Sequence, residues 1–228
     1  MKAGKTNFGR FSLFSALFNF AAAISTPLFA IYMLRDLHFS YLTYMIITVS
    51  GTIFSLIVME LWGKIADRYG NYIVLYITSI LTAAIPILWI FSPSPIYLIF
   101  IPTLIGGLAS SGLNLATSDF IYDNVRIEKR GLVVSYFNML NGIGIFFGAA
   151  IGAFLIQFLT IGFINPIFFI FLLSGVIGIL SVFLLMPMVM EVRKIKRDRL
   201  KNVIFKQLKP VMLCEFHEIM SIKRYLTK

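Results

Sequence analysis

Six long apolar stretches follow one another along the chain, separated by short polar segments. They cover residues 11–34, 41–62, 72–91, 96–118, 132–159 and 166–190. Each reaches or approaches the roughly 20 residues that an α-helix needs to cross the hydrocarbon core of a bilayer. Between the third and fourth stretches, Ser92-Pro93-Ser94-Pro95 predicts a tight turn, because proline lacks the amide that would continue a helix. The pattern predicts an all-α membrane protein with six transmembrane helices.

The composition agrees with a membrane location. Hydrophobic residues make up 59% of the 228 residues, which leaves too few polar side chains to cover a water-exposed surface. The lipid bilayer is therefore an expected partner. The net charge of +10 would suggest nucleic acid in a soluble protein, but the basic residues all lie outside the apolar stretches. Nucleic acid is accordingly not an expected partner.

No metal or cofactor site is expected from the sequence. Cys214 is the only cysteine, so neither an intrachain disulfide nor a thiolate metal site can form. His38 and His217 lie far apart and outside any ligand spacing. The apolar stretches contain no nucleophile and base pair and no ligand cluster, so the sequence does not predict an enzyme.

Lysine and arginine in the connecting segments predict the orientation, because they favour the cytoplasmic side. They precede the first stretch, follow the second and fourth, and crowd the chain after the sixth; Arg35 alone lies on the other side. We expect a multi-pass protein of the cell membrane with both termini cytoplasmic. The first stretch also resembles a signal peptide, but its apolar run continues to Leu34 and is long enough to span a bilayer.

An abrupt change of composition after residue 190 predicts two domains, a six-helix bundle over 1–190 and a basic cytoplasmic tail over 191–228. In the tail, basic and apolar residues alternate at helical spacing. This pattern predicts an amphipathic helix lying on anionic headgroups, with a calmodulin-like or nucleic-acid partner of the tail as the alternative.

The polar segment 63–72, between the second and third stretches, combines glycines with a carboxylate and an arginine. Gly63 and Gly70 permit tight turns and close helix approach, and Asn71 is suited to cap the following helix. Near the positive end of that helix, Asp67 would pair with Arg68 or with a basic residue of a neighbouring helix and so act as a latch that favours one arrangement of the bundle. An ordinary polar turn is the alternative.

The sequence Gly63-Lys64-Ile65-Ala66-Asp67-Arg68-Tyr69-Gly70 closely resembles the loop motif after the second helix of each half in the major facilitator superfamily of secondary transporters. The resemblance spans about residues 11–190 and implies one six-helix half, built as a 3+3 inverted repeat. It implies a conformational gate at Asp67 and Arg68, with Gly63 and Gly70 as packing positions. The family often has basic residues where Asn71 and Tyr72 stand here.

Two details favour the carboxyl-terminal half. The fourth helix of the amino-terminal half usually carries an arginine four residues before a glycine, whereas Pro102 or Thr103 stands there in this chain. The segment 27–37 also resembles the seventh helix of many prokaryotic members. An amino-terminal half remains the alternative.

Small residues in the fifth stretch predict close helix packing. Gly144, Gly148 and Gly152 lie four residues apart and share one helix face, where they let backbones touch. The stretch also partly resembles the fifth-helix motif of antiporter members, although that motif's proline is Ala149 here.

Polar residues within the stretches indicate a solute pathway, because buried polar groups are costly in lipid. In the family fold, the first and fourth helices line the central cavity, so Asn19 and Asn114 are the candidate substrate contacts; interhelical hydrogen bonding is the alternative. Glu60 is expected to pair with the motif rather than carry protons. Four charged residues after the fourth stretch would form a gate network with the motif, or be solvated: Asp119, Asp123, Arg126 and Arg130.

These features predict a half-transporter that moves a small solute by alternating access. A single half would act as a homodimer or with a separately encoded other half, or else be an inactive truncated product. A non-transporting assembly or signalling module is the rival prediction.

Overall fold

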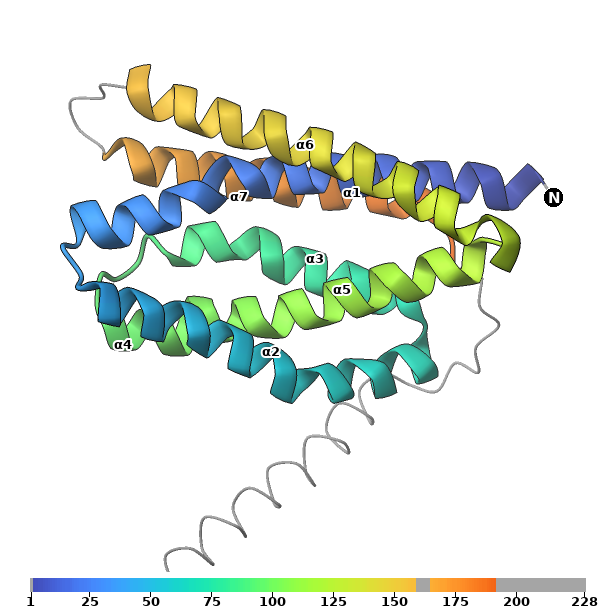
Figure 1. Cartoon of the computed structure of the whole chain (residues 1–228), viewed down its shortest axis with the longest axis horizontal. Coiled ribbons are helices and arrows are strands. Elements are labelled where there is room, and N and C mark those ends of the chain that lie inside the picture. Colours follow the sequence, from blue (N-terminus) through green and yellow to red (C-terminus); the bar gives the residue numbers. More distant parts are fainter. Residues whose placement is uncertain (1, 159–164, 192–228) are drawn as a thin grey trace, which may run out of the picture. The chain divides into compact units, whose positions relative to one another are not determined.

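The computed structural model describes residues 2–158 and 165–191, which are built almost entirely of helices (Figure 1). The elements are α1 (Lys2–Ile31), the π-helical turn η1 (Tyr32–Asp36), α2 (Tyr41–Tyr69), α3 (Asn71–Leu88), α4 (Pro95–Leu98), the π-helical turn η2 (Ile99–Thr103), α5 (Leu104–Asn124), the 3₁₀ turn η3 (Ile127–Lys129), α6 (Arg130–Phe158), α7 (Pro166–Leu185) and the 3₁₀ turn η4 (Met186–Met188). Within the described ranges, six helical segments are long and apolar enough to cross a membrane. The all-α, six-span prediction is confirmed.

The chain divides into two units, Met1–Lys194 and Ile195–Lys228. The first unit contains all the helices from α1 to α7. The second unit lies outside the described residues, and so does the amphipathic helix predicted for the tail.

The helices of the first unit form two sets of three, α1 to α3 and α5 to α7, which make equivalent contacts. The long central helix α1 packs against α6 and α7, while α5 packs against α2 and α3, and α3 packs against α7. Exchanging α1, α2 and α3 for α5, α6 and α7 therefore reproduces the same set of contacts. By contrast, α1 and α5 touch each other at few places, which leaves room for cavities between them.

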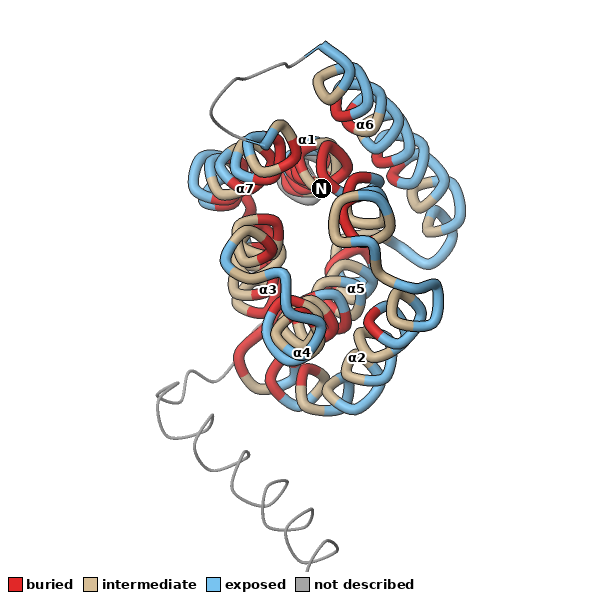
Figure 2. The backbone as a smooth tube through the Cα atoms, turned by 90° about the vertical axis from the view of Figure 1, so that its left-hand side faces the viewer, coloured by how far each residue is buried: buried red, intermediate tan, exposed pale blue. Residues whose placement is uncertain are grey.

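The helices α2 and α6 flank the bundle and expose most of their apolar surface (Figure 2). Only 6% of the apolar window of α2 and 11% of that of α6 is buried, against 33% to 44% in the other four spans. Apolar faces of this kind require lipid or another protein to cover them.

An aromatic cluster fixes one end of α1 against its neighbours. The ring of Phe29 lies 4.7 Å from that of Trp89, at the end of α3, and 4.8 Å from that of Phe171 in α7. Tyr32 meets the same two rings edge-on at 6.4 and 5.9 Å. Such pairs add specific geometry to the burial of large apolar surfaces.

Several helix boundaries differ from the sequence prediction, most clearly at the end of the second span. The second span was expected to end at Trp62, but α2 continues through Tyr69, because nothing in residues 63–69 breaks a helix. In the fourth span, Pro102 lies in a π-helical turn that joins α4 to α5, as expected where a proline lacks its backbone amide. The predicted break between the third and fourth spans is confirmed, since the chain is not helical over 92–94 and α4 begins at Pro95.

Candidate functional site

The segment 63–72 is a helix end rather than a loop. Only Gly70 leaves the helical conformation, with φ 95° and ψ 159°, and there α2 gives way to α3. That positive φ explains the glycine, since L side chains rarely adopt it. Gly63 lies inside α2, so the turn predicted for it is wrong, and a Cβ there would meet no described atom within 4 Å. Asp67 is exposed, and the guanidinium of Arg68 lies 5.8 Å from the ring of Tyr69.

The start of α3 is bound by acidic residues from distant parts of the chain. The Oε2 atom of Glu191 accepts the backbone N–H of Tyr72 at 2.8 Å, where a carboxylate favours the positive end of the helix. The fully buried Asn71 donates through Nδ2 to Asp123 Oδ2 at 2.9 Å. The prediction that Asn71 caps α3 is therefore wrong, because its side chain bonds the end of α5 instead.

A second group of hydrogen bonds closes the same end of the bundle. Asn7, buried in α1, donates to the carbonyl of Met190 at 2.8 Å and accepts the Met190 N–H at 2.8 Å. Its Nδ2 also donates to Asn124 Oδ1 at 3.0 Å. The beginning of α1, the end of α5 and the segment after α7 are thus held together.

The remaining charged residues predicted near the gate make local contacts. Glu60 pairs with Lys64 at 2.6 Å, one helical turn away on the exposed surface of α2. Arg130 donates to the carbonyls of Tyr122 and Val125, which closes the connection between α5 and α6. Asp119 and Arg126 each have an interaction as well.

The three glycines of α6 lie against the backbone of α1. A Cβ added at Gly144 would lie 2.5 Å from the carbonyl oxygen of Ala16. At Gly148 and Gly152 it would fall well inside 3.0 Å of the carbonyl oxygens of Phe20 and Ile24. The contact advances four residues along each helix at every step, so the two helices run in parallel and in constant register.

Asn19 and Asn114 line one cavity. This cavity has a volume of about 170 Å³ and lies between α1, α3, α5 and α6. Its polar side chains are Ser15, Asn19, Asn114, Thr117 and Asn141, set among aromatic rings that include Phe11, Phe14 and Phe137. Two residues that are far apart in sequence, and that were predicted from it to contact substrate, are therefore brought together.

Hydrogen bonds fix how the amides of this polar cavity are turned. Asn19 Nδ2 donates to the Ser15 carbonyl at 2.9 Å and to Asn141 Oδ1 at 3.1 Å. Because a carbonyl only accepts, the Asn19 group beside it must be the NH₂, and its partner on Asn141 must be the oxygen. Ser15 Oγ also donates to that oxygen at 3.0 Å. Within the part of the chain that the structure describes, this arrangement leaves the Asn19 oxygen and the Asn141 NH₂ for another partner.

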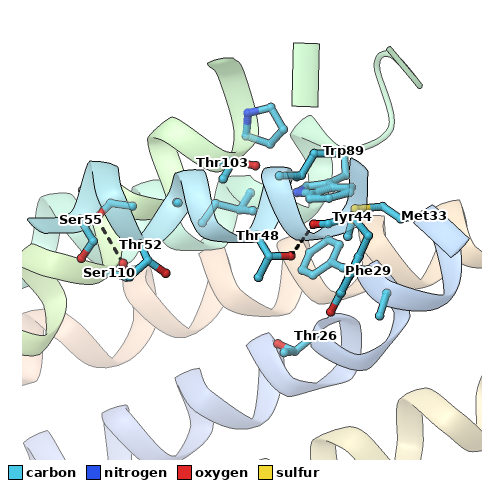
Figure 3. A pocket seen from close by; sticks show the side chains of 17 residues that line it. Thr26, Phe29, Met33, Tyr44, Thr48, Thr52, Ser55, Trp89, Thr103 and Ser110 are labelled. Atoms are coloured by element: carbon cyan, nitrogen blue, oxygen red, sulfur yellow. Dashed lines mark hydrogen bonds between the residues drawn. The ribbon is translucent and has the colours of Figure 1, made fainter. Parts of the chain in front are cut away.

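A larger cavity of about 450 Å³ lies between the far end of α1, the first half of α2, and α3, η2 and α5 (Figure 3). Sequence reasoning missed most of its wall. On α2, the residues Tyr44, Thr48, Thr52 and Ser55 follow one another at spacings of four and three, which places them on one helix face. That polar stripe in an apolar stretch was the signal that could have revealed the wall.

Among the described residues, no cluster of three or more His, Cys, Asp or Glu side chains could hold a metal ion.

Comparison with known proteins identifies the family. A search of curated proteins found no match. A sequence profile of the Major Facilitator Superfamily matches residues 11–221, which extends past the expected end of the resemblance at residue 190. A match of this length, together with the bundle of apolar helices, shows that the chain belongs to the major facilitator superfamily of membrane transporters.

Proposed function

We propose that this chain is one six-helix half of a transporter that moves a small solute by alternating access. The observation that carries the proposal is the shared cavity of Asn19 and Asn114. These residues lie on the first helix of each three-helix set, α1 and α5, which touch each other at few places. A polar cavity at that position offers hydrogen bonds to a solute inside an otherwise apolar bundle.

A second half is part of the proposal. The contact pattern of the two three-helix sets supports a 3+3 repeat, and α2 and α6 offer the uncovered apolar faces that another bundle would pack against. The second half is a second copy of this chain or a separately encoded bundle. The absence of the fourth-helix arginine supports assignment of this chain as the carboxyl-terminal half.

The gate is assigned to Asp67 and Arg68 at the end of α2. Both residues have interaction partners, and Gly70 supplies the bend into α3. The positions of lysine and arginine in the connecting segments support a cytoplasmic location for the gate and for both termini.

The test uses the full chain in lipid. Its mass in lipid nanodiscs is expected to match a dimer, or a complex with a co-purified second bundle. Liposomes containing the assembled protein are expected to exchange a member of a panel of small solutes, detected by mass spectrometry. Asp67→Asn should abolish or strongly slow the exchange without affecting insertion, whereas Glu128→Gln, at an exposed acid outside the motif, should leave it unchanged.

A different result would reject the proposal. An inert, stable monomer would favour a truncated product or a non-transporting module that recruits a partner through its tail. Equal exchange by the wild-type chain and Asp67→Asn would reduce the motif to a bend between two helices.

A further inference from the structure

The larger cavity has two chemically different ends. Phe29, Tyr44 and Trp89 gather at one end with Met33, and Thr52, Ser55 and Ser110 line the other (Figure 3). The rings of Phe29 and Trp89 pack at 4.7 Å and form a continuous aromatic wall. A ligand that fills the space must therefore present an apolar face to one end and polar groups to the other.

Several hydroxyl groups of the wall have already used their hydrogen. Thr26 donates to the Ala22 carbonyl at 2.9 Å and Thr48 to the Tyr44 carbonyl at 2.9 Å. Ser110 likewise donates to the Gly107 carbonyl at 3.2 Å. A hydroxyl has one donor and two acceptor sites, so these side chains offer only lone pairs to a ligand. The ligand must then bring hydrogen-bond donors of its own.

The remaining hydroxyls are less restricted. The side chains of Thr52, Ser55 and Thr103 have no hydrogen-bond partner among the residues that the structure describes. They are able to donate as well as accept. Groups that do both, such as alcohols, fit this mixture better than groups that only accept.

No charged side chain lines the cavity: the wall contains no Asp, Glu, Lys, Arg or His within the described residues. A charged ligand would lose its hydration there without gaining an opposite charge, and this makes burial of an ion costly. Aromatic rings also attract cations, but this attraction is weak compared with the cost of removing an ion from water.

We propose that this cavity binds an uncharged solute with an aromatic or apolar ring at one end and hydroxyl groups at the other, as in an aryl glycoside. The assignment of this ligand as a transported solute rests on the proposed function above. Its binding is a separate property that can be measured without transport. The volume of about 450 Å³ suits a molecule of two rings.

The test measures equilibrium binding of radiolabelled phenyl β-D-glucopyranoside to the full chain in nanodiscs. Two matched competitors keep its size and rings: phenyl β-D-glucuronide carries a carboxylate in place of the 6-hydroxymethyl group, and the 2-amino-2-deoxy analogue carries an ammonium group in place of the 2-hydroxyl group. We expect saturable binding of the neutral glycoside and at least about tenfold weaker competition by both charged analogues. Equal or tighter binding of either charged analogue, or no saturable binding, would overturn the proposal.

Two tryptophans allow the ligand to be located. Trp62→Phe leaves Trp89, in the wall of the larger cavity, as the only tryptophan, and its emission should shift on saturation with the glycoside.

Thr48→Val removes one hydrogen-bond acceptor from the wall of the cavity and is expected to weaken glycoside binding about three- to tenfold. Thr82→Val is the matched control, because that hydroxyl also donates one turn back along its helix, but outside the cavity. Equal effects of the two Thr→Val changes would show that the ligand binds outside this cavity.

The outcomes for binding and transport are distinguishable. Binding with the expected selectivity but without exchange across liposomes would reject the transport function and keep the site. Exchange of other solutes, with no saturable glycoside binding, would keep the transport function and reject the ligand class proposed here.

Discussion

We expect replacement of Gly148 by alanine to separate α6 from α1. The added Cβ would lie well inside 3.0 Å of the Phe20 carbonyl oxygen and 3.0 Å from the Cβ of Ala23. Neither obstacle is the end of a flexible side chain, so one helix must move. A matched control lies six residues earlier on the same helix, because a Cβ at Gly142 meets nothing within 4 Å in the described structure.

Two opposing contributions set the expected change in the free energy of unfolding. Overpacking of a close contact typically costs about 1–3 kcal/mol. Replacing glycine by alanine within a helix returns up to about 1 kcal/mol through backbone entropy and helix propensity. Gly142→Ala experiences only the favourable term. We therefore expect the free energy of unfolding of Gly148→Ala to fall below that of Gly142→Ala by about 1–3 kcal/mol.

A further variant tests the register of the two helices. Once α1 has moved away from the methyl group added at position 148, an alanine at position 144 has less to displace. The double variant Gly144→Ala/Gly148→Ala should therefore cost less than the sum of the single variants. Unfolding is followed by tryptophan emission and circular dichroism in mixed micelles of neutral detergent and dodecyl sulfate. Equal unfolding curves for Gly142→Ala and Gly148→Ala would refute the close contact, and strict additivity would refute a rigid shift of α1.

Three further predictions concern the cavities and the end of the bundle. Gly106→Ala should be tolerated and Gly107→Ala should lower thermal stability, because a Cβ meets a side chain at 3.5 Å in the first case and the α2 backbone at 2.5 Å in the second; equal melting temperatures would contradict this. Asn114→Ala should weaken solute exchange and leave stability unchanged, whereas Asn19→Ala should also reduce stability, since only Asn19 forms side-chain hydrogen bonds among the described residues. Glu191→Ala should destabilise the fold by about 0.5–2 kcal/mol through loss of the cap on α3. A chemical unfolding curve identical to that of the wild-type chain would contradict that role.

The apolar pattern predicted the spans well because membrane insertion depends on local hydrophobicity and length, both of which are visible in the sequence. It predicted helix ends less well. Beyond Trp62 the chain becomes polar but keeps good helix formers, so α2 extends to Tyr69. Hydrophobicity marks where the bilayer ends, whereas the helix ends only where the backbone conformation changes, at Gly70.

The candidate site was predictable in part. Asn19 and Asn114 were identified because they are polar residues on the first and fourth spans, which line the central cavity in the family that the chain resembles, and the structure shows that they line one cavity. The partners of the start of α3 were not predictable, because Asp123 and Glu191 reach it from 52 and 119 residues away. Pairing at such distances depends on how the helices pack, and composition or spacing carries no information about it.

Hydrogen bonds of Asn71, Tyr72 and Asn7 explain how this end of the bundle is held together without basic residues at positions 71 and 72. The family often has basic residues where Asn71 and Tyr72 stand, yet here an amide and a backbone N–H bind Asp123 and Glu191. With the bonds of Asn7, they join α1, α3, α5 and the segment after α7. Hydrogen bonds contribute about 0.5–1.5 kcal/mol each, and those to charged groups about 1.5–3. Their sum is large enough to keep both three-helix sets together at this end, so motion on solute binding is expected where α1 and α5 make few contacts, at the cavities between them.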